Sequence, residues 1–118
     1  MTDGTVSWLE EAERYVADCR ARATSVRASE FATRMNLTPA QLVRHFQASV
    51  GVCVKEHLRA KQVERAQQLL RETRQGTAEI ATATGFGTPR SFYRAFRRCT
   101  GMSPTEYRKE MSLVKPDF

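Results

Sequence analysis

The sequence contains two copies of one motif, fifty residues apart, and this repeat constrains the fold more than any other feature. The first copy opens at Thr38-Pro39 and the second at Thr88-Pro89. Matching pairs then follow in register: Leu42 and Phe92, Arg44 and Arg94, Phe46 and Phe96, Gly51 and Gly101, Val52 and Met102, Cys53 and Ser103, Glu56 and Glu106, His57 and Tyr107. The repeat predicts two structurally equivalent units in one chain.

Each copy carries the signals that start and stop a helix. Threonine is a good N-cap, and proline at the first helical position sacrifices no hydrogen bond. A glycine twelve residues after each proline can end the helix in the left-handed conformation. One face of each predicted helix is apolar and should dock inward, through Leu42 and Phe46 in the first copy and Phe92 and Phe96 in the second.

A shorter helical segment precedes each capped helix, over residues 28–35 and 77–84. Each segment holds an alanine that permits close helix crossing, and four residues later comes Asn36 or Gly85, both of which tolerate a positive φ. This arrangement predicts a helix-turn-helix in each copy, with one extra residue in the second turn.

The sequence predicts helices in the rest of the chain as well, because it contains no alternating runs of β-branched residues and no hairpin turns. Apolar residues at helical spacing predict a first helix over 7–22, through Trp8, Leu9, Ala12, Tyr15, Val16 and Cys19. A similar pattern predicts a long helix over 54–71, through Val54, Leu58, Ala60, Val63, Ala66, Leu69 and Leu70. We therefore expect an all-α fold of about seven helices, in which two helix-turn-helix units are joined by a long linker helix.

The predicted organisation has five parts. They are an N-terminal amphipathic helix that packs on the first unit (1–25), the first helix-turn-helix (26–53), the linker helix (54–75), the second helix-turn-helix with a terminal helix (76–110) and a tail (111–118). The methionine at the start and the helix that follows it favour a complete, stand-alone protein, and one domain of a longer regulator is the alternative.

The chain is basic, with a formal net charge of +6, and the charge is unevenly distributed. Residues 1–30 hold four arginines and six acids, whereas residues 31–118 hold fifteen basic residues and seven acids. Fifteen of the nineteen basic residues are arginine, whose planar guanidinium suits phosphates and guanine edges. A solvated basic face is the alternative, and only the positions of the arginines can decide between the two.

Other classes of function find little support in the sequence. The three cysteines are far apart and form no CxxC pair, which argues against a disulfide framework and favours a reducing compartment. Cys53 and His57, with Cys99 or His45 as a third ligand, could form a metal site, but core filling is the favoured interpretation, and Cys99 is expected in the core.

The sequence also lacks a nucleophile and base pair, paired catalytic carboxylates and a phosphate loop. A signal peptide and an apolar run of about 20 residues are likewise missing. We expect no enzyme, no cofactor, no metal and no membrane contact, and a cytoplasmic, nucleoid-associated protein.

From residue 26 to residue 108 the sequence resembles the DNA-binding region of the AraC/XylS family of bacterial transcription regulators. The resemblance is carried by Ile80-Ala81, Gly85-Phe86, the run from Ser91 to Arg98, Gly101-Met102-Ser103-Pro104 and Tyr107-Arg108, with earlier matches at Leu42, Arg44, Phe46, Gly51, Leu58, Arg59, Ala66, Leu69 and Leu70. It implies a monomer that places its two capped helices in successive major-groove segments of double-stranded DNA, about 34 to 36 Å apart. It also implies RNA polymerase as a partner.

The resemblance assigns roles to outward residues of the capped helices. The implied base contacts are Ala40, Val43 and Arg44 in the first unit and Pro89, Arg90, Tyr93 and Arg94 in the second. The implied phosphate contacts are Thr38, Gln47, Thr88, Ser91, Arg97 and Arg98. Arg44 and Arg94 are the strongest candidates for bidentate contacts with guanine, and a phosphate clamp or a surface salt bridge is the alternative for both.

The sequence departs from the family pattern in the first unit. Ala40 and Val43 are apolar, so base readout there would rest on Arg44 and on contacts with thymine methyl groups. Cys53-Val54 replaces the Ser-Pro pair of the second copy, which predicts a weaker helix cap. We therefore expect the second unit to contribute at least as much specificity. The alternative functions are a helical protein-interaction module that binds an acidic partner and a non-specific DNA-packaging protein.

Overall fold

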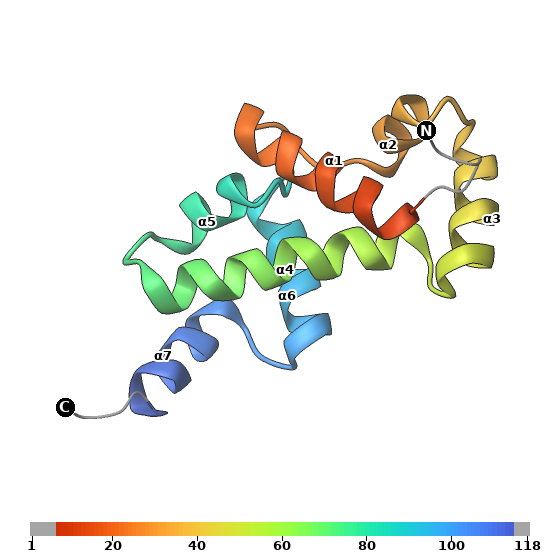
Figure 1. Ribbon diagram of the computed structural model, residues 1–118. Coiled ribbons are helices and arrows are strands. Elements are labelled where there is room, and N and C mark those ends of the chain that lie inside the picture. Colours follow the sequence, from red (N-terminus) through yellow and green to blue (C-terminus); the bar gives the residue numbers. More distant parts are fainter. Residues whose placement is uncertain (1–6, 115–118) are drawn as a thin grey trace.

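The structure is a computed structural model that describes residues 7–114, with side chains described to Met111. Within that range the chain forms seven helices and no strand, as predicted (Figure 1). They are α1 (Trp8–Arg22), α2 (Ala28–Arg34), α3 (Pro39–Val50), α4 (Val54–Glu72), α5 (Thr77–Ala83), α6 (Pro89–Thr100) and α7 (Pro104–Val114). The second half of the predicted tail, residues 115–118, lies outside the described residues.

The molecule is elongated, with principal extents of 51 × 28 × 25 Å, and α4 forms its spine. Figure 1 shows α3 at one end of α4, while α6 passes behind α4 and α7 lies near its far end. Two separate hydrophobic clusters follow from this arrangement, one at each end of the spine. Each cluster contains one predicted helix-turn-helix.

The first cluster joins α1 to the helices α2 and α3 and to the start of α4. Tyr15 is its most constrained member, because its ring stacks on Phe31 with 5.3 Å between the ring centroids. Its hydroxyl donates a hydrogen bond to Glu30 Oε1 at 2.7 Å and accepts one from the backbone N–H of Arg27 at 2.9 Å. Burial raises the pKa of this hydroxyl well above its ordinary value. The phenol therefore stays protonated and ties α1 to the start of α2.

The second cluster is built around the aromatic side chains of α6 and its neighbours. Phe92 contacts Phe86 at a centroid distance of 5.4 Å, and Phe96 contacts Phe92 and Tyr107 edge to face. Such tilted arrangements align the positive ring edge with the negative ring face. The Tyr107 hydroxyl accepts a hydrogen bond of 2.7 Å from Arg71, which attaches α7 to the end of α4.

Three residues predicted to be apolar core lie at the surface. Half of Leu9 is exposed, because the buried face of α1 runs through Ala12 and Tyr15 and turns Leu9 to solvent. Ala60 is exposed on the solvent side of α4. Cys99, predicted to lie in the core one turn after Phe96, is exposed in an open groove between α4 and α6. The α4 side chains that line this groove are the charged Lys55, Glu56 and Arg59, and the thiol is open to solvent.

Candidate nucleic-acid interface

The helix α3 presents one buried and one exposed face. Its N-terminus is closed by a capping box, in which the Gln41 backbone N–H donates to Thr38 Oγ1 at 3.1 Å and the Thr38 N–H donates to Gln41 Oε1 at 2.9 Å. Gly51 ends the helix at φ 92°, as predicted. Because Leu42 and Phe46 are fully buried, the opposite face is exposed, and it carries the predicted residues Ala40, Val43, Arg44 and Gln47.

The helix α6 repeats this design. The Ser91 backbone N–H donates to Thr88 Oγ1 at 3.0 Å, and Gly101 ends the helix at φ 81°. Phe92 and Phe96 are buried as predicted. The outward face carries Pro89, Arg90, Tyr93, Arg94 and Arg97, all of them exposed.

The turns that lead into these two helices also follow the prediction. Asn36 has φ 61° and Gly85 has φ 84°, so both adopt the left-handed conformation that allows a tight reversal. Residues 35–38 separate α2 from α3, whereas residues 84–88 separate α5 from α6, which places one more residue in the second turn.

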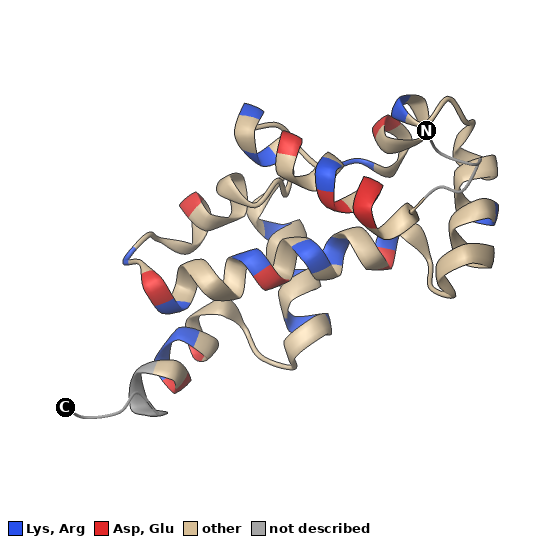
Figure 2. Cartoon of the chain, viewed as in Figure 1, with Lys and Arg blue, Asp and Glu red and all other residues tan. Residues whose placement is uncertain are grey.

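The outward faces of α3 and α6 carry arginines for which no ion pair with an acid is described. Neither helix contains an acid, and Figure 2 shows the red acidic segments on other helices, α1 among them. Among the described ion pairs, none involves Arg44, Arg90, Arg94 or Arg97. Arg98 differs, because it forms a surface pair of 3.7 Å with Glu56 of α4. Exposed guanidinium groups of this kind can bind phosphates or base edges.

A surface hollow lies beside the outward face of α6 in the second unit. It is lined by Thr77 at the start of α5 and by the first turns of α6, through Pro89, Arg90, Phe92, Tyr93 and Arg94. The Tyr93 hydroxyl lies 3.4 Å from Thr105 Oγ1, which orients the exposed ring along the surface. The structure thereby brings together all four predicted base contacts of the second unit. It likewise brings together the three of the first unit on α3.

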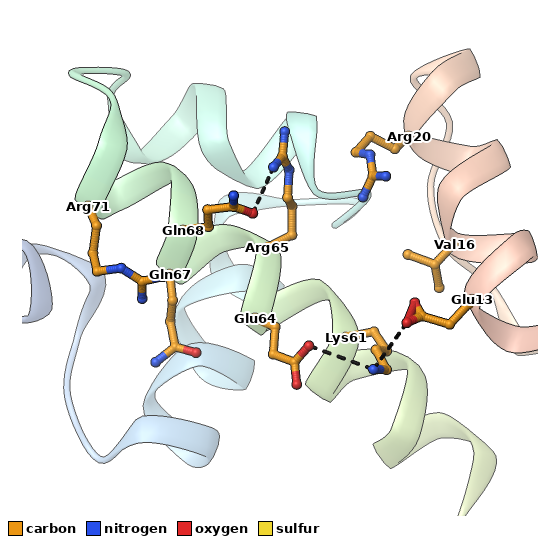
Figure 3. A pocket seen from close by; sticks show the side chains of 9 residues that line it. All are labelled: Glu13, Val16, Arg20, Lys61, Glu64, Arg65, Gln67, Gln68 and Arg71. Atoms are coloured by element: carbon orange, nitrogen blue, oxygen red, sulfur yellow. Dashed lines mark hydrogen bonds and ion pairs between the residues drawn. The ribbon is translucent and has the colours of Figure 1, made fainter. Parts of the chain in front are cut away.

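Another groove of about 380 Å³ lies between α1 and α4, and none of its lining residues belongs to α3 or α6. Figure 3 shows Lys61 of α4 between two carboxylates, Glu13 of α1 at 3.3 Å and Glu64 at 3.7 Å. The Arg65 guanidinium donates to Gln68 Oε1 at 2.8 Å. Acids and bases are interspersed in this groove. Its composition therefore differs from that of the outward faces of α3 and α6, which carry no acid.

The alternative metal site gains no support from the geometry. Cys53 is half-buried, Cys99 is exposed in a different groove, and His57 packs on the Phe46 ring at 5.4 Å. Within the described part of the chain, no three His, Cys, Asp or Glu residues gather as metal ligands could. None of the described helices has the length and apolar character needed to cross a membrane.

Comparison with known proteins agrees with this geometry. A family model described as a helix-turn-helix domain, of the AraC type, matches residues 31–110. The chain belongs to the AraC family. The arabinose operon regulatory protein of Escherichia coli is 32% identical over 100 residues, which cover 85% of this chain and 34% of that protein. The Msm operon regulatory protein of Streptococcus mutans is 32% identical over 88 residues, covering 75% of this chain and 32% of that one.

Solved structures show the same fold. The DNA-binding domain of AdpA, determined in complex with a target DNA, superposes with a TM-score of 0.76 at 25% identity and covers 92% of this chain and 98% of that domain. The regulator CdpR of Pseudomonas aeruginosa has a TM-score of 0.66 at 31% identity, covering 84% of this chain and 31% of that one. The chain spans about a third of the length of the curated AraC-type relatives it matches.

Sequence reasoning missed one buried polar residue that supports this interface. Gln62 of α4 is buried, and its Nε2 donates a hydrogen bond of 3.0 Å to the carbonyl of Thr84. That carbonyl belongs to the turn before α6. The signal was its spacing, because Gln62 lies one helical turn after Leu58 and one before Ala66, on the apolar face of the linker pattern.

Proposed function

We propose that this AraC-family chain recognises a specific sequence in double-stranded DNA and thereby regulates bacterial transcription. In this proposal α3 and α6 enter successive major-groove segments on one face of the duplex, about one helical turn apart. The observation that carries it is the pairing of two equivalently capped helices whose exposed faces hold unneutralised arginines. A single chain would then contact two successive segments, for which dimeric regulators use two chains, and its site would not be a palindrome.

The proposed base contacts are Ala40, Val43 and Arg44 on α3 and Pro89, Arg90, Tyr93 and Arg94 on α6. Arg44 and Arg94 would each hold O6 and N7 of a guanine, the commonest specific contact of an arginine. Thr38, Gln47, Thr88, Ser91, Arg97 and Arg98 would contact phosphates. Thr38 and Thr88 are placed for this because each caps a helix whose N-terminal N–H groups and dipole favour an anion.

The proposal also covers the wider setting of the protein. Residues 26–53 and 76–110 would act as the two DNA-binding units, with 54–75 as their linker and 1–25 as a support for the first. The chain would bind DNA as a monomer in the cytoplasm, at the nucleoid, and would contact RNA polymerase. Neither a catalytic step nor a cofactor belongs to the proposal.

Selection of bound sequences from a random duplex library tests the proposal directly. We expect two short elements whose centres are about ten base pairs apart. A single element, or none, would contradict it.

Two further measurements separate the alternatives. A DNA-packaging protein would bind a scrambled version of the selected site with nearly unchanged affinity. A protein-interaction module would bind DNA weakly and with little dependence on salt, whereas a DNA reader loses affinity steeply as salt rises.

A further inference from the structure

A row of basic side chains on α4 connects the two DNA-binding units. Lys55 and Arg59, one helical turn apart on the first half of α4, line two adjoining hollows. The first hollow is shared with α6 and includes Arg98, and the second is shared with the start of α2 and includes Arg27. We call Arg27, Lys55, Arg59 and Arg98 the linker strip.

The charge of the linker strip is almost unopposed. Glu56 is the only acid that lines either hollow, and its 3.7 Å pair with Arg98 joins two largely exposed side chains. Exposed ion pairs contribute little to stability, so Arg98 can exchange this partner for another anion at little cost. The described ion pairs include none with Arg27, Lys55 or Arg59.

Another basic residue of α4, Lys61, is paired with acids and provides a comparison. On the side that faces α1, Lys61 pairs with both Glu13 and Glu64 (Figure 3). Two acids therefore accompany Lys61, whereas the described ion pairs include none with Lys55 or Arg59.

The position of the linker strip indicates which anion it would bind, namely the phosphates of DNA. Arg98 follows Arg94 by one helical turn, so the strip continues the outward face of α6 toward α4. From there it runs along the part of α4 that lies between α3 and α6 (Figure 1). When two helices occupy major-groove segments one turn apart, the intervening duplex presents its minor groove, lined by phosphates, to the protein between them.

We propose that the linker strip binds the phosphates that flank the minor groove of this spacer. The inference rests on the proposed function, since it requires α3 and α6 to occupy the two neighbouring segments. Contacts with phosphates add affinity and fix the register of the duplex without reading bases. The linker helix is therefore a third DNA-contacting element, which clamps the spacer while α3 and α6 read the sequence on either side.

The first test compares two doubly substituted proteins. Lys55→Gln/Arg59→Gln removes two charges from the strip, and Arg20→Gln/Arg22→Gln removes two exposed charges from the end of α1 as a control. The dissociation constant is measured against salt concentration on a selected duplex of about 30 base pairs. Each lost phosphate contact should lower the magnitude of the salt slope by about 1, and therefore by about 2 for the strip variant, with little change for the control.

The preference for the selected site over a scrambled one should remain as in the wild type, since phosphate contacts carry no base information. An unchanged slope in the strip variant, or an equal change in the control, would overturn the inference.

The second test uses DNA whose spacer phosphates are replaced by uncharged methylphosphonates. The wild-type protein should lose affinity on this duplex, and the strip variant should lose several-fold less, because its contacts are already gone. Equal losses for the two proteins would overturn the inference.

The proposed function can fail separately from this inference. It fails if Arg44→Ala and Arg94→Ala leave the sequence preference intact. If those variants lose preference while the strip variant keeps its salt slope, only the linker strip is refuted.

Discussion

The backbone N–H of Val26 donates a hydrogen bond of 2.9 Å to the carbonyl of Gly85, and these residues belong to different units of the molecule. Val26 precedes α2 of the first unit, whereas Gly85 forms the turn before α6 of the second. Gln62 of the linker helix holds the adjacent carbonyl of Thr84. The turn of the second unit is therefore fixed from two directions, which helps to set the position of α6 relative to α3.

Gly85→Ala should destabilise the protein more than the same change at Gly51. Both glycines have a positive φ, at 84° and 92°, which costs a residue with a Cβ about 1 to 2 kcal/mol. At Gly85 the new Cβ would also lie 2.8 Å from Val26 Cγ2 and 3.3 Å from the Val26 backbone nitrogen, whereas at Gly51 it would meet nothing within 4 Å. Urea unfolding of the two variants measures the difference in the free energy of unfolding.

The matched rescue is Val26→Ala in the Gly85→Ala background. Removing the valine methyl groups relieves the closest contact, so this second change should cost less stability there than it costs in the wild type. Equal destabilisation by Gly85→Ala and Gly51→Ala would show that the contact between residue 85 and Val26 does not restrict the side chain at position 85.

The two copies of the repeat differ in how they cap the next helix, and this difference predicts a stabilising substitution. Ser103 and Glu106 form a reciprocal cap on α7, with hydrogen bonds of 3.1 and 2.9 Å. Cys53 occupies the equivalent position before α4 and makes no side-chain cap bond, although Glu56 lies in the right place. Cys53→Ser should therefore raise the free energy of unfolding by about 0.5 to 1 kcal/mol.

Ser103→Ala provides the comparison, because it removes the existing cap and should lower the free energy of unfolding by about 0.5 to 2 kcal/mol. Thermal or urea unfolding reports both changes. A Cys53→Ser protein no more stable than the wild type would mean that Glu56 does not leave Arg98 to complete the cap.

His57 should make the stability of the fold depend on pH. Burial lowers the pKa of His57 below its ordinary value of 6.5, and the Lys61 ammonium lowers it further, partly opposed by Glu13 and Glu64. The unfolded chain therefore takes up a proton at a higher pH than the folded chain does. The contribution of neutral His57 to the free energy of unfolding is complete above pH 6.5. It is lost as the pH falls from there through the pKa of His57 in the folded chain.

His57→Phe should reduce the loss of unfolding free energy between about pH 7.5 and pH 5.5, measured by urea unfolding at each pH. His45→Gln is the control, since His45 is an exposed residue and its removal should leave the dependence in place. The same pH dependence in His57→Phe and wild type would assign it to other groups.

The helices and their ends were predictable because their signals are local. Threonine, proline and glycine at fixed offsets determine where α3 and α6 begin and end, whatever surrounds them. Burial is less local, since it depends on which element covers a face. Cys99 has the spacing of a core residue on α6, but the neighbouring turn of α4 bears charged side chains and leaves it exposed.

The candidate site divides in the same way. The outward positions of α3 and α6 follow from helical periodicity, so the sequence could name Arg44 and Arg94 in advance. The linker strip could not be named, because Arg27, Lys55 and Arg98 come from three helical regions that only the tertiary fold brings together. Likewise, the partner of Gln62 lies twenty-two residues further along the chain.

Substitution of the exposed arginines of α3 and α6 provides the most direct test of whether these helices recognise DNA bases. Arg44→Ala and Arg94→Ala should each weaken binding to the selected site by about 1 to 3 kcal/mol and relax the base preference at one position. Arg97→Ala, on the same exposed face of α6, should instead weaken binding to selected and scrambled duplexes alike, as the loss of a phosphate contact does. If Arg44→Ala and Arg94→Ala behave like Arg97→Ala, both arginines bind phosphate.

The two units should contribute unequally to specificity. On α6, Arg90, Tyr93 and Arg94 are all exposed and polar, whereas Arg44 is the only charged residue among the predicted base contacts of α3. Base changes in the DNA element bound by α6 should therefore weaken binding at least as much as changes in the element bound by α3. Dissociation constants for duplexes with one element scrambled at a time measure this, and a larger loss from the α3 element would contradict it, assigning most of the readout to Ala40, Val43 and Arg44.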